Sequence, residues 1–152
     1  PSIREEDISE YFDIDRLSPY MLLVAEVVKD KQLPMTTEQE SYFGLKKLNI
    51  PRSEIPAVTH VDYSARVQTV KKNTNNRYYD LISKFKEKTG CPVIVNTSFN
   101  VRGEPIVNTP SDAFNCFMGT ELDYLVIGDC ILDKSKQDLT LKKDYTKEFE
   151  LD

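Results

Sequence analysis

Long apolar runs are missing from this sequence, and their absence narrows the class of protein. The longest mostly apolar stretch, residues 20–28, is well short of the roughly 20 residues that a membrane-spanning helix needs. No positively charged leader precedes an apolar run, so the sequence predicts neither a membrane protein nor a secreted one. Only 5 glycines and 8 prolines occur among 152 residues, which argues against a fibrous or low-complexity chain. The 39% of hydrophobic residues suffice for the core of one domain.

Cysteine and histidine are scarce, which limits the metal and redox chemistry of the chain. The three cysteines, Cys91, Cys116 and Cys130, are odd in number and widely spaced. They fit neither a disulfide framework nor a zinc site. With His60 as the single histidine, we expect no transition-metal site built from this chain. Unpaired thiols are typical of a reducing compartment, so the sequence predicts a cytoplasmic protein.

The chain also lacks a surplus of positive charge. It carries 20 basic and 25 acidic side chains, which gives a net charge of −5. Domains that bind nucleic acid usually carry a basic surplus, so nucleic acid is not an expected partner. A small anionic ligand remains compatible with this charge, because a pocket needs only a few local cations or oriented amides.

Apolar spacing and turn residues predict alternating helices and strands, and therefore an α/β domain with a mixed sheet. Helices are predicted over residues 3–12 and 75–89, and a third one begins at Thr109. Strands are predicted over residues 20–28, 56–61, 65–70, 92–96, 104–108 and 123–132, the last one broken at Gly128. Residues 29–55 are expected to form a long excursion with one helical turn around residues 42–48. We expect one domain over residues 1–133 and a charged tail over residues 134–152.

The densest group of polar side chains follows the predicted strand at residues 92–96 directly. It contains four compact donors and acceptors: Asn96, Thr97, Ser98 and Asn100. Ligands of α/β proteins tend to bind where strands end, so this cluster is a candidate site for a phosphate or a carbamate-like group. The same residue types are typical of an ordinary turn, and both interpretations remain open at this point.

Two further residues carry charge or acid–base chemistry next to apolar neighbours. Alternation along residues 65–70 places Arg66 on the opposite face from Ala65 and Val67. An arginine on such a face either reaches solvent or binds an anion such as phosphate. His60 is either a buried structural histidine or part of a pocket, and Asp62 follows closely enough to orient it.

Several stretches resemble the C-terminal region of the NodU/CmcH/TobZ-type O-carbamoyltransferases. The two longest are Ile55-Pro-Ala-Val-Thr-His-Val-Asp-Tyr-Ser-Ala-Arg-Val-Gln-Thr-Val70 and Pro92-Val-Ile-Val-Asn-Thr-Ser-Phe-Asn-Val-Arg-Gly-Glu-Pro-Ile-Val107. The shorter ones are Ser18-Pro-Tyr-Met21, Asn108-Thr-Pro-Ser-Asp-Ala-Phe114 and Leu122-Asp-Tyr-Leu-Val-Ile-Gly128. The resemblance covers roughly residues 2–134, and its two long motifs occur in the order typical of the family.

The resemblance implies a fold and a reaction. Enzymes of this family carbamoylate an acceptor hydroxyl. Their C-terminal half is YrdC-like, with a twisted mixed sheet and flanking helices, and makes carbamoyl adenylate from carbamoyl phosphate and ATP, with Mg²⁺ accompanying the ATP. Their N-terminal half is actin/sugar-kinase-like and passes the carbamoyl group to the acceptor. The chain is therefore expected to work with such an N-terminal half.

The resemblance also implies roles for particular residues. Arg66 is expected to bind phosphate oxygens and Ser98 to hold the carbamoyl or phosphate oxygens, as the two catalytic positions. The residues expected to contact nucleotide or carbamoyl groups are His60, Asn96, Thr97, Asn100 and Arg102.

The chain departs from the family pattern in ways that bear on activity. Tyr63 replaces a glycine, Asn108 replaces a frequent cysteine, and the upstream stretch with a phosphate-binding lysine and arginine is absent. We therefore expect a fragment that is inactive alone, and self-association through an exposed sheet edge. Two other functions remain open: a module that binds nucleotide or carbamoyl phosphate without turnover, and a YrdC-type RNA-related domain.

Overall fold

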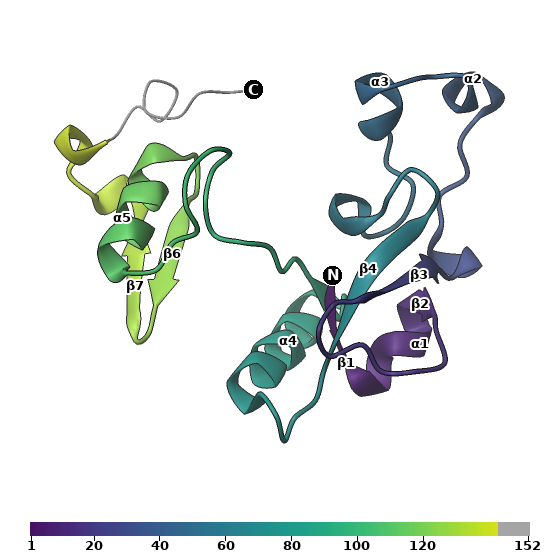
Figure 1. The fold of residues 1–152 in the computed structure, drawn as a ribbon, viewed down its shortest axis with the longest axis horizontal. Helices are drawn as coiled ribbons and strands as arrows, with labels where there is room; N and C mark the ends of the chain where they lie inside the picture. Colours follow the sequence, from purple (N-terminus) through teal and green to yellow (C-terminus); the bar gives the residue numbers. More distant parts are fainter. Residues whose placement is uncertain (143–152) are drawn as a thin grey trace. The chain divides into compact units, whose positions relative to one another are not determined.

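The computed structural model describes residues 1–142, which form two compact units. The first unit is Pro1–Asn96, and the second begins at Thr97 (Figure 1).

The first unit is built on a five-stranded sheet with the strand order β2-β3-β4-β1-β5. The strands are β1 (Ser2–Arg4), β2 (Phe12–Asp13), β3 (Leu23–Val27), β4 (Ser64–Val70) and β5 (Val93–Ile94). β1 and β4 are parallel, whereas the other neighbouring strands are antiparallel. The predicted α/β class with a mixed sheet is therefore confirmed. Short β2 and β5 are the edge strands, and self-association through an edge stays a prediction.

The two faces of the sheet differ in what covers them. Side chains that alternate along β4 bury Ala65, Val67 and Thr69 on one face, as predicted from the sequence. The core on that face consists of Ile3, Tyr11, Phe12, Ala25, Val27, Ile55, Ala65, Val67 and Val93. Arg66 projects from the opposite face and is exposed, so this second face is open around the middle of β4.

Helix α4 (Asn76–Thr89) is the longest helix of the described residues and confirms the prediction for residues 75–89. The Asn75 side chain accepts a hydrogen bond from the Tyr78 amide and so caps the first turn. Gly90 ends the helix with φ +78°, a left-handed conformation that glycine adopts at low cost. Ile82 is completely buried, whereas the neighbouring Leu81 is 57% exposed.

Residues 29–55 form the expected excursion. They contain the 3-10 helix η2 (Lys29–Lys31) and the single-turn helices α2 (Thr37–Glu40) and α3 (Leu45–Leu48). α3 confirms the helical turn predicted around residues 42–48. A single bridge between Gln32 and Ser53 closes the base of the excursion.

A buried carboxylate connects the start of the sheet to α4. Asp7 lies in η1 (Glu5–Asp7), directly before α1 (Ile8–Tyr11), and is 7% exposed. Its Oδ2 is 2.6 Å from Arg4 Nη2, and its Oδ1 is 2.9 Å from Lys86 Nζ on α4. Burial alone would raise the pKa of Asp7, but the hydrogen bonds from Arg4 and Lys86 outweigh it and lower the pKa.

Replacing Asp7 by asparagine is expected to lower the free energy of unfolding at neutral pH by about 2 kcal/mol, because two charge-assisted hydrogen bonds are lost. The lowered pKa means that the wild-type contribution is complete above the ordinary value of 3.8 and disappears as pH falls through the folded-state value. Denaturant unfolding of both proteins at about pH 7 and about pH 2.5 measures the effect. The stability gap should shrink at the lower pH, and a constant gap would contradict the assignment.

The second unit packs helix α5 (Pro110–Gly119) on the hairpin of β6 (Tyr124–Ile127) and β7 (Cys130–Asp133). Thr109 and Asp112 form the predicted start of α5 as a capping box. The core of this unit comprises Ala113, Phe117, Met118 and Leu125, with Phe99, Val107, Phe114, Ile127 and Leu132 against it. Two 3-10 turns follow, η4 (Lys134–Lys136) and η5 (Leu139–Leu141). The rest of the predicted tail lies outside the described residues.

Three sequence predictions of secondary structure are wrong in whole or in part. Residues 3–12 were expected to form one helix; Glu5–Tyr11 is helical, as η1 and α1, but Ser2–Arg4 is strand β1, and the Ser2 hydroxyl donates to Gln68. Pro56–Val58 is the 3-10 helix η3 instead of a strand, because proline at its start favours a helical turn. Residues 104–108 form no strand, and the carbonyl and carboxylate of Glu104 accept hydrogen bonds from Asn100 and Val101 within the loop. The strand predicted over residues 20–28 is shorter and only half-buried, with Val24 60% exposed.

Candidate functional site

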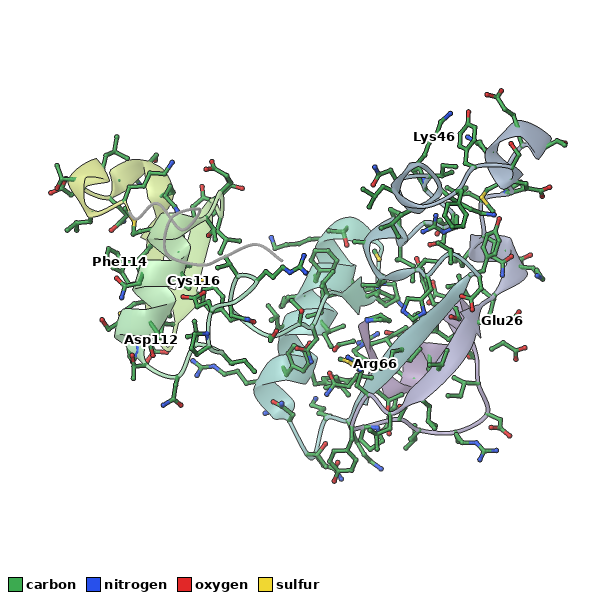
Figure 2. The ribbon with its side chains drawn as sticks, turned by 45° about the horizontal axis from the view of Figure 1, so that its top comes forward. Glu26, Lys46, Arg66, Asp112, Phe114 and Cys116 are labelled. Atoms are coloured by element: carbon green, nitrogen blue, oxygen red, sulfur yellow. The ribbon has the colours of Figure 1, made fainter. Side chains whose placement is uncertain are left out.

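The open face of β4 carries Arg66. In the pairing with β3, Arg66 lies opposite Val24, and Ser64 lies opposite Glu26. Figure 2 shows Arg66 and Glu26 on these neighbouring strands. Within residues 1–142, no hydrogen bond or ion pair engages the Arg66 guanidinium. An exposed guanidinium without a protein partner is well suited to bind the oxygens of a phosphate.

Gln68, two residues further along the same face, is fixed from three sides. Its Oε1 accepts hydrogen bonds from Ser2 Oγ at 2.7 Å and from Asn96 Nδ2 at 2.6 Å. Its Nε2 donates to the Pro19 carbonyl at 3.2 Å. The structure thus places the predicted residue Asn96 beside β4, on the side chain of Gln68.

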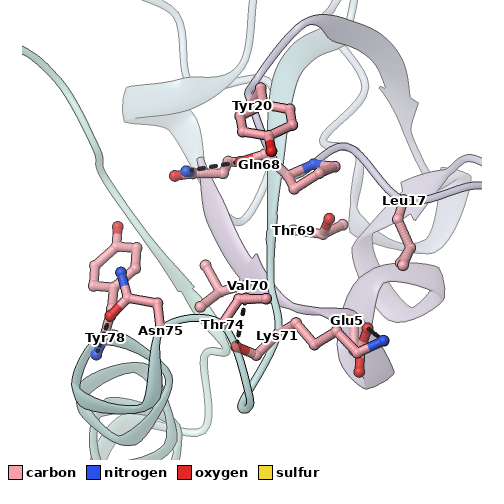
Figure 3. Close-up of a pocket in the computed structure, with 11 residues that line it drawn as sticks. Glu5, Leu17, Tyr20, Gln68, Thr69, Val70, Lys71, Thr74, Asn75 and Tyr78 are labelled. Carbon is pink, nitrogen blue, oxygen red and sulfur yellow. Dashed lines mark hydrogen bonds and ion pairs between the residues drawn. The ribbon is translucent and has the colours of Figure 1, made fainter.

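A cavity of about 320 Å³ lies where β4 ends and α4 begins (Figure 3). It is lined by Glu5, Leu17, Pro19, Tyr20, Gln68, Thr69, Val70, Lys71, Thr74, Asn75 and Tyr78. The lining comes from four segments: η1, the loop before β3, the end of β4 with the turn after it, and the start of α4. Gln68 belongs both to this cavity and to the open face that carries Arg66.

The lining of this cavity combines aromatic, amide and charged groups. Tyr20 and Tyr78 supply rings on which a planar ligand can stack. Lys71 lies 3.8 Å from Glu5, a loose ion pair that leaves the ammonium able to reach an anion. The volume is at the lower end of the range for small-molecule sites, which begins at about 300 Å³. The cavity can therefore accept a planar ring with hydroxyl groups and a nearby negative charge.

His60 is exposed, so the interpretation as a buried structural histidine is wrong. Its Nδ1 is 2.9 Å from Ser64 Oγ, and Ser64 Oγ donates to Asp62 Oδ1 at 2.7 Å. Asp62 thus reaches the imidazole through Ser64. The hydrogen bonds from the Ser64 hydroxyl and amide lower the pKa of Asp62, which keeps this carboxylate ionised.

The remaining predicted residues belong to the second unit. Thr97, Ser98 and Arg102 are exposed in the loop before α5. Asn100 is half-buried, and its Nδ2 donates to the carbonyls of Val101 and Glu104 at 3.1 and 3.0 Å. The amide of Asn100 therefore shapes this loop. The catalytic role of Ser98 stays a prediction.

The buried thiol of Cys116 is not a candidate nucleophile. Cys91, Cys116 and Cys130 are all free. Burial, aided by the nearby Glu104, raises the pKa of Cys116 to about 11. A thiol with so high a pKa is protonated at neutral pH and unreactive. Residues 1–142 contain no cluster of three or more His, Cys, Asp or Glu side chains that could hold a metal ion.

Sequence reasoning missed most of the cavity. Gln68 had a signal, because alternation placed it on the same face as Arg66. Tyr20, Lys71 and Tyr78 had none, since each lies in a different element and only the folded chain brings them together.

These observations define an α/β domain in which three features lie along β4: the exposed Arg66, His60 linked through Ser64 to Asp62, and a small cavity. A model of the carbamoyltransferase C-terminus family matches residues 1–134 of the chain. The chain therefore belongs to this family of carbamoyltransferase C-terminal domains.

Curated relatives agree with this assignment. An uncharacterized protein of Synechocystis is 56% identical over 153 residues, covering 100% of this chain and 25% of the relative. The nodulation protein NolO of Bradyrhizobium diazoefficiens is 39% identical over 137 residues, covering 88% of this chain and 21% of the relative. A 3'-hydroxymethylcephem-O-carbamoyltransferase of Amycolatopsis lactamdurans is 35% identical over 129 residues, covering 85% of this chain and 21% of the relative. The chain thus spans a quarter or less of these relatives.

No helix within residues 1–142 combines the length and the apolar character needed to cross a bilayer.

Proposed function

We propose that this chain is the part of an O-carbamoyltransferase that forms carbamoyl adenylate from carbamoyl phosphate and ATP. The carbamoyl group then passes to an acceptor hydroxyl held by another part of a longer polypeptide, of the actin/sugar-kinase-like type that the resemblance implies. Membership of the family supports carbamoyl transfer, and one relative is a 3'-hydroxymethylcephem-O-carbamoyltransferase. The free thiols fit a reducing compartment, so the proposal places this reaction in the cytoplasm.

The order of groups along β4 is the observation that carries the proposal. Three groups follow one another on the same face of β4. The first is Ser64, which is hydrogen-bonded to His60; the second is Arg66; the third is Gln68, which lines the cavity. Every second residue of a strand advances by about 6.7 Å. Carbamoyl adenylate has a matching linear order: a small planar carbamoyl group, a phosphate, and then a ribose and a purine ring. Arg66 would hold the phosphate and the tyrosine-lined cavity the nucleoside.

The chemistry needs positioning more than a protein nucleophile. Carbamoyl phosphate first loses its phosphate to water, which leaves carbamate. A carbamate oxygen then bonds to the α-phosphorus of ATP, the bond to the β-phosphate oxygen breaks, and pyrophosphate leaves with the electron pair. Arg66 would stabilise the negative charge that gathers on the α-phosphate oxygens. Mg²⁺ enters this scheme with ATP as part of the substrate. The resemblance alone supports the roles predicted for Ser98, Thr97, Asn100 and Arg102.

Exchange of labelled pyrophosphate into ATP, dependent on carbamoyl phosphate, tests the proposal. The assay compares this chain alone with the same chain joined to the upstream three quarters of the Synechocystis relative. Only the joined protein is expected to catalyse exchange, because the upstream segment supplies the further cationic residues that the resemblance implies. A folded joined protein that binds ATP and carbamoyl phosphate without exchange would instead favour a binding module. Salt-dependent binding of tRNA would favour the RNA-related alternative.

A further inference from the structure

His60 is held more firmly than an exposed side chain requires. Its backbone amide donates to the Ser64 carbonyl at 2.8 Å, and its carbonyl accepts from the Tyr63 amide at 3.1 Å. The same carbonyl accepts from Nε of the buried Arg52 at 3.0 Å. Tyr63 completes the turn with φ +66°, a conformation that is unfavourable for tyrosine. The chain therefore accepts local strain at the turn that sets the position of His60.

The hydrogen bonds of the neighbouring side chains fix which ring nitrogen carries the proton. Ser64 has a single hydroxyl hydrogen, and it is donated to Asp62 Oδ1 at 2.7 Å. The Ser64 oxygen can therefore only accept from His60 Nδ1, which lies 2.9 Å away. In the neutral ring, Nδ1 then carries the hydrogen and Nε2 is an acceptor, on a residue that is exposed.

We propose that Nε2 of His60 accepts a hydrogen bond from the N–H of the carbamoyl group, and that Ser64 and Asp62 are positioning residues that fix the required tautomer. This inference rests on the proposed function and assigns the chemical selectivity of its site. The carbamoyl group differs from an acetyl group by replacing a methyl with an amine that donates hydrogen bonds. An acceptor held on Ser64, at the start of β4, recognises that difference, and Arg66 lies two residues beyond Ser64 on the same face to bind the phosphate.

A site that is built to bind an N–H group discriminates strongly against an analogue that lacks it, because the acceptor is then left without a partner. The joined protein should therefore prefer carbamoyl phosphate to acetyl phosphate in the exchange assay, by at least about 100-fold in kcat/KM. His60→Ala should reduce this preference by about 10-fold or more, through a lower rate with carbamoyl phosphate. His60→Gln, whose amide oxygen is an acceptor at similar reach, should retain most of it.

The positioning role has a separate readout on the 152-residue chain. Because His60 is the single histidine, two-bond ¹H–¹⁵N correlations report its tautomer without overlap. The wild type should show the Nδ1–H form in the neutral ring. Ser64→Ala should shift the ring toward the Nε2–H form, and in the joined protein it should lower the preference for carbamoyl phosphate, whereas Ser64→Thr should restore both.

The possible failures can be told apart. If the wild-type joined protein catalyses exchange with neither substrate, the proposed function is wrong, and the role of His60 is lost with it. If exchange proceeds but His60→Ala keeps the full preference for carbamoyl phosphate, the role of His60 alone is wrong. If the wild type shows the Nε2–H tautomer, Ser64 and Asp62 do not position the ring.

Discussion

Replacing Arg52 by methionine is expected to lower the free energy of unfolding of the chain by about 3–4 kcal/mol. Arg52 is 2% exposed, and its guanidinium donates hydrogen bonds to backbone carbonyls. The accepting carbonyls belong to Lys47, Leu48, Ile50, Thr59 and His60. Methionine has a similar length and no donors, so several buried carbonyls would lose their partners at once.

Two matched variants make this prediction specific. Arg52→Lys keeps the charge, but one ammonium group cannot reach carbonyls on both sides of the loop, so most of the loss should persist. Arg16→Met removes an arginine whose side chain is 69% exposed and should change stability by less than about 0.5 kcal/mol. Denaturant unfolding followed by circular dichroism measures all three. A loss below about 1 kcal/mol for Arg52→Met would show that water replaces the guanidinium.

Arg52 also connects stability to the site. Its Nε holds the carbonyl of His60, so its removal should loosen the turn that positions the imidazole. The His60 tautomer measured by NMR in a folded Arg52→Lys protein reports this loosening directly.

The parts of the fold that the sequence predicted well are those with local causes. The Asn75 cap determines where helix α4 begins, and Gly90 determines where it ends. The capping box of Thr109 and Asp112 determines where α5 begins. These signals lie within a few residues of the structure that they determine. The alternation that exposes Arg66 is equally local.

The errors have non-local causes. Strand β1 was mistaken for the start of a helix, because Ser2–Arg4 is short and its partners, β4 and β5, lie more than 60 residues away in sequence. The core position of Ile3 depends on that pairing. Arg52 gave no signal either, since its partners are backbone carbonyls, which every residue type provides equally.

The candidate site divides in the same way. Arg66 follows from the period of a strand, and the resemblance identified the motif that contains it. The cavity at the end of β4 could not be predicted, because four segments separated in sequence build it. The tautomer of His60 could not be predicted either, because it depends on hydrogen bonds that link His60 through Ser64 to Asp62 and form only in the folded turn.

Arg66→Ala should have the largest effect on activity. If the guanidinium makes a charge-assisted hydrogen bond to phosphate, its loss weakens binding by about 1.5–3 kcal/mol, which is about 10- to 150-fold. The effect should appear in kcat/KM for ATP in the exchange assay of the joined protein. The kcat/KM of Arg66→Lys should lie between those of the wild type and Arg66→Ala, because a lysine keeps the charge but lacks the planar guanidinium.

The same substitution should leave folding intact, which separates binding from stability. Arg66 is exposed and, within residues 1–142, makes no hydrogen bond or ion pair, so its removal should change stability by less than about 0.5 kcal/mol. Lys84→Ala removes a cation that is 70% exposed on α4 and serves as the control for net charge. If Arg66→Ala and Lys84→Ala lower the rate of exchange equally, Arg66 contributes only through the overall electrostatic field of the domain. A specific loss in Arg66→Ala, at unchanged stability, would place the phosphate on the open face of β4, between His60 and the tyrosine-lined cavity.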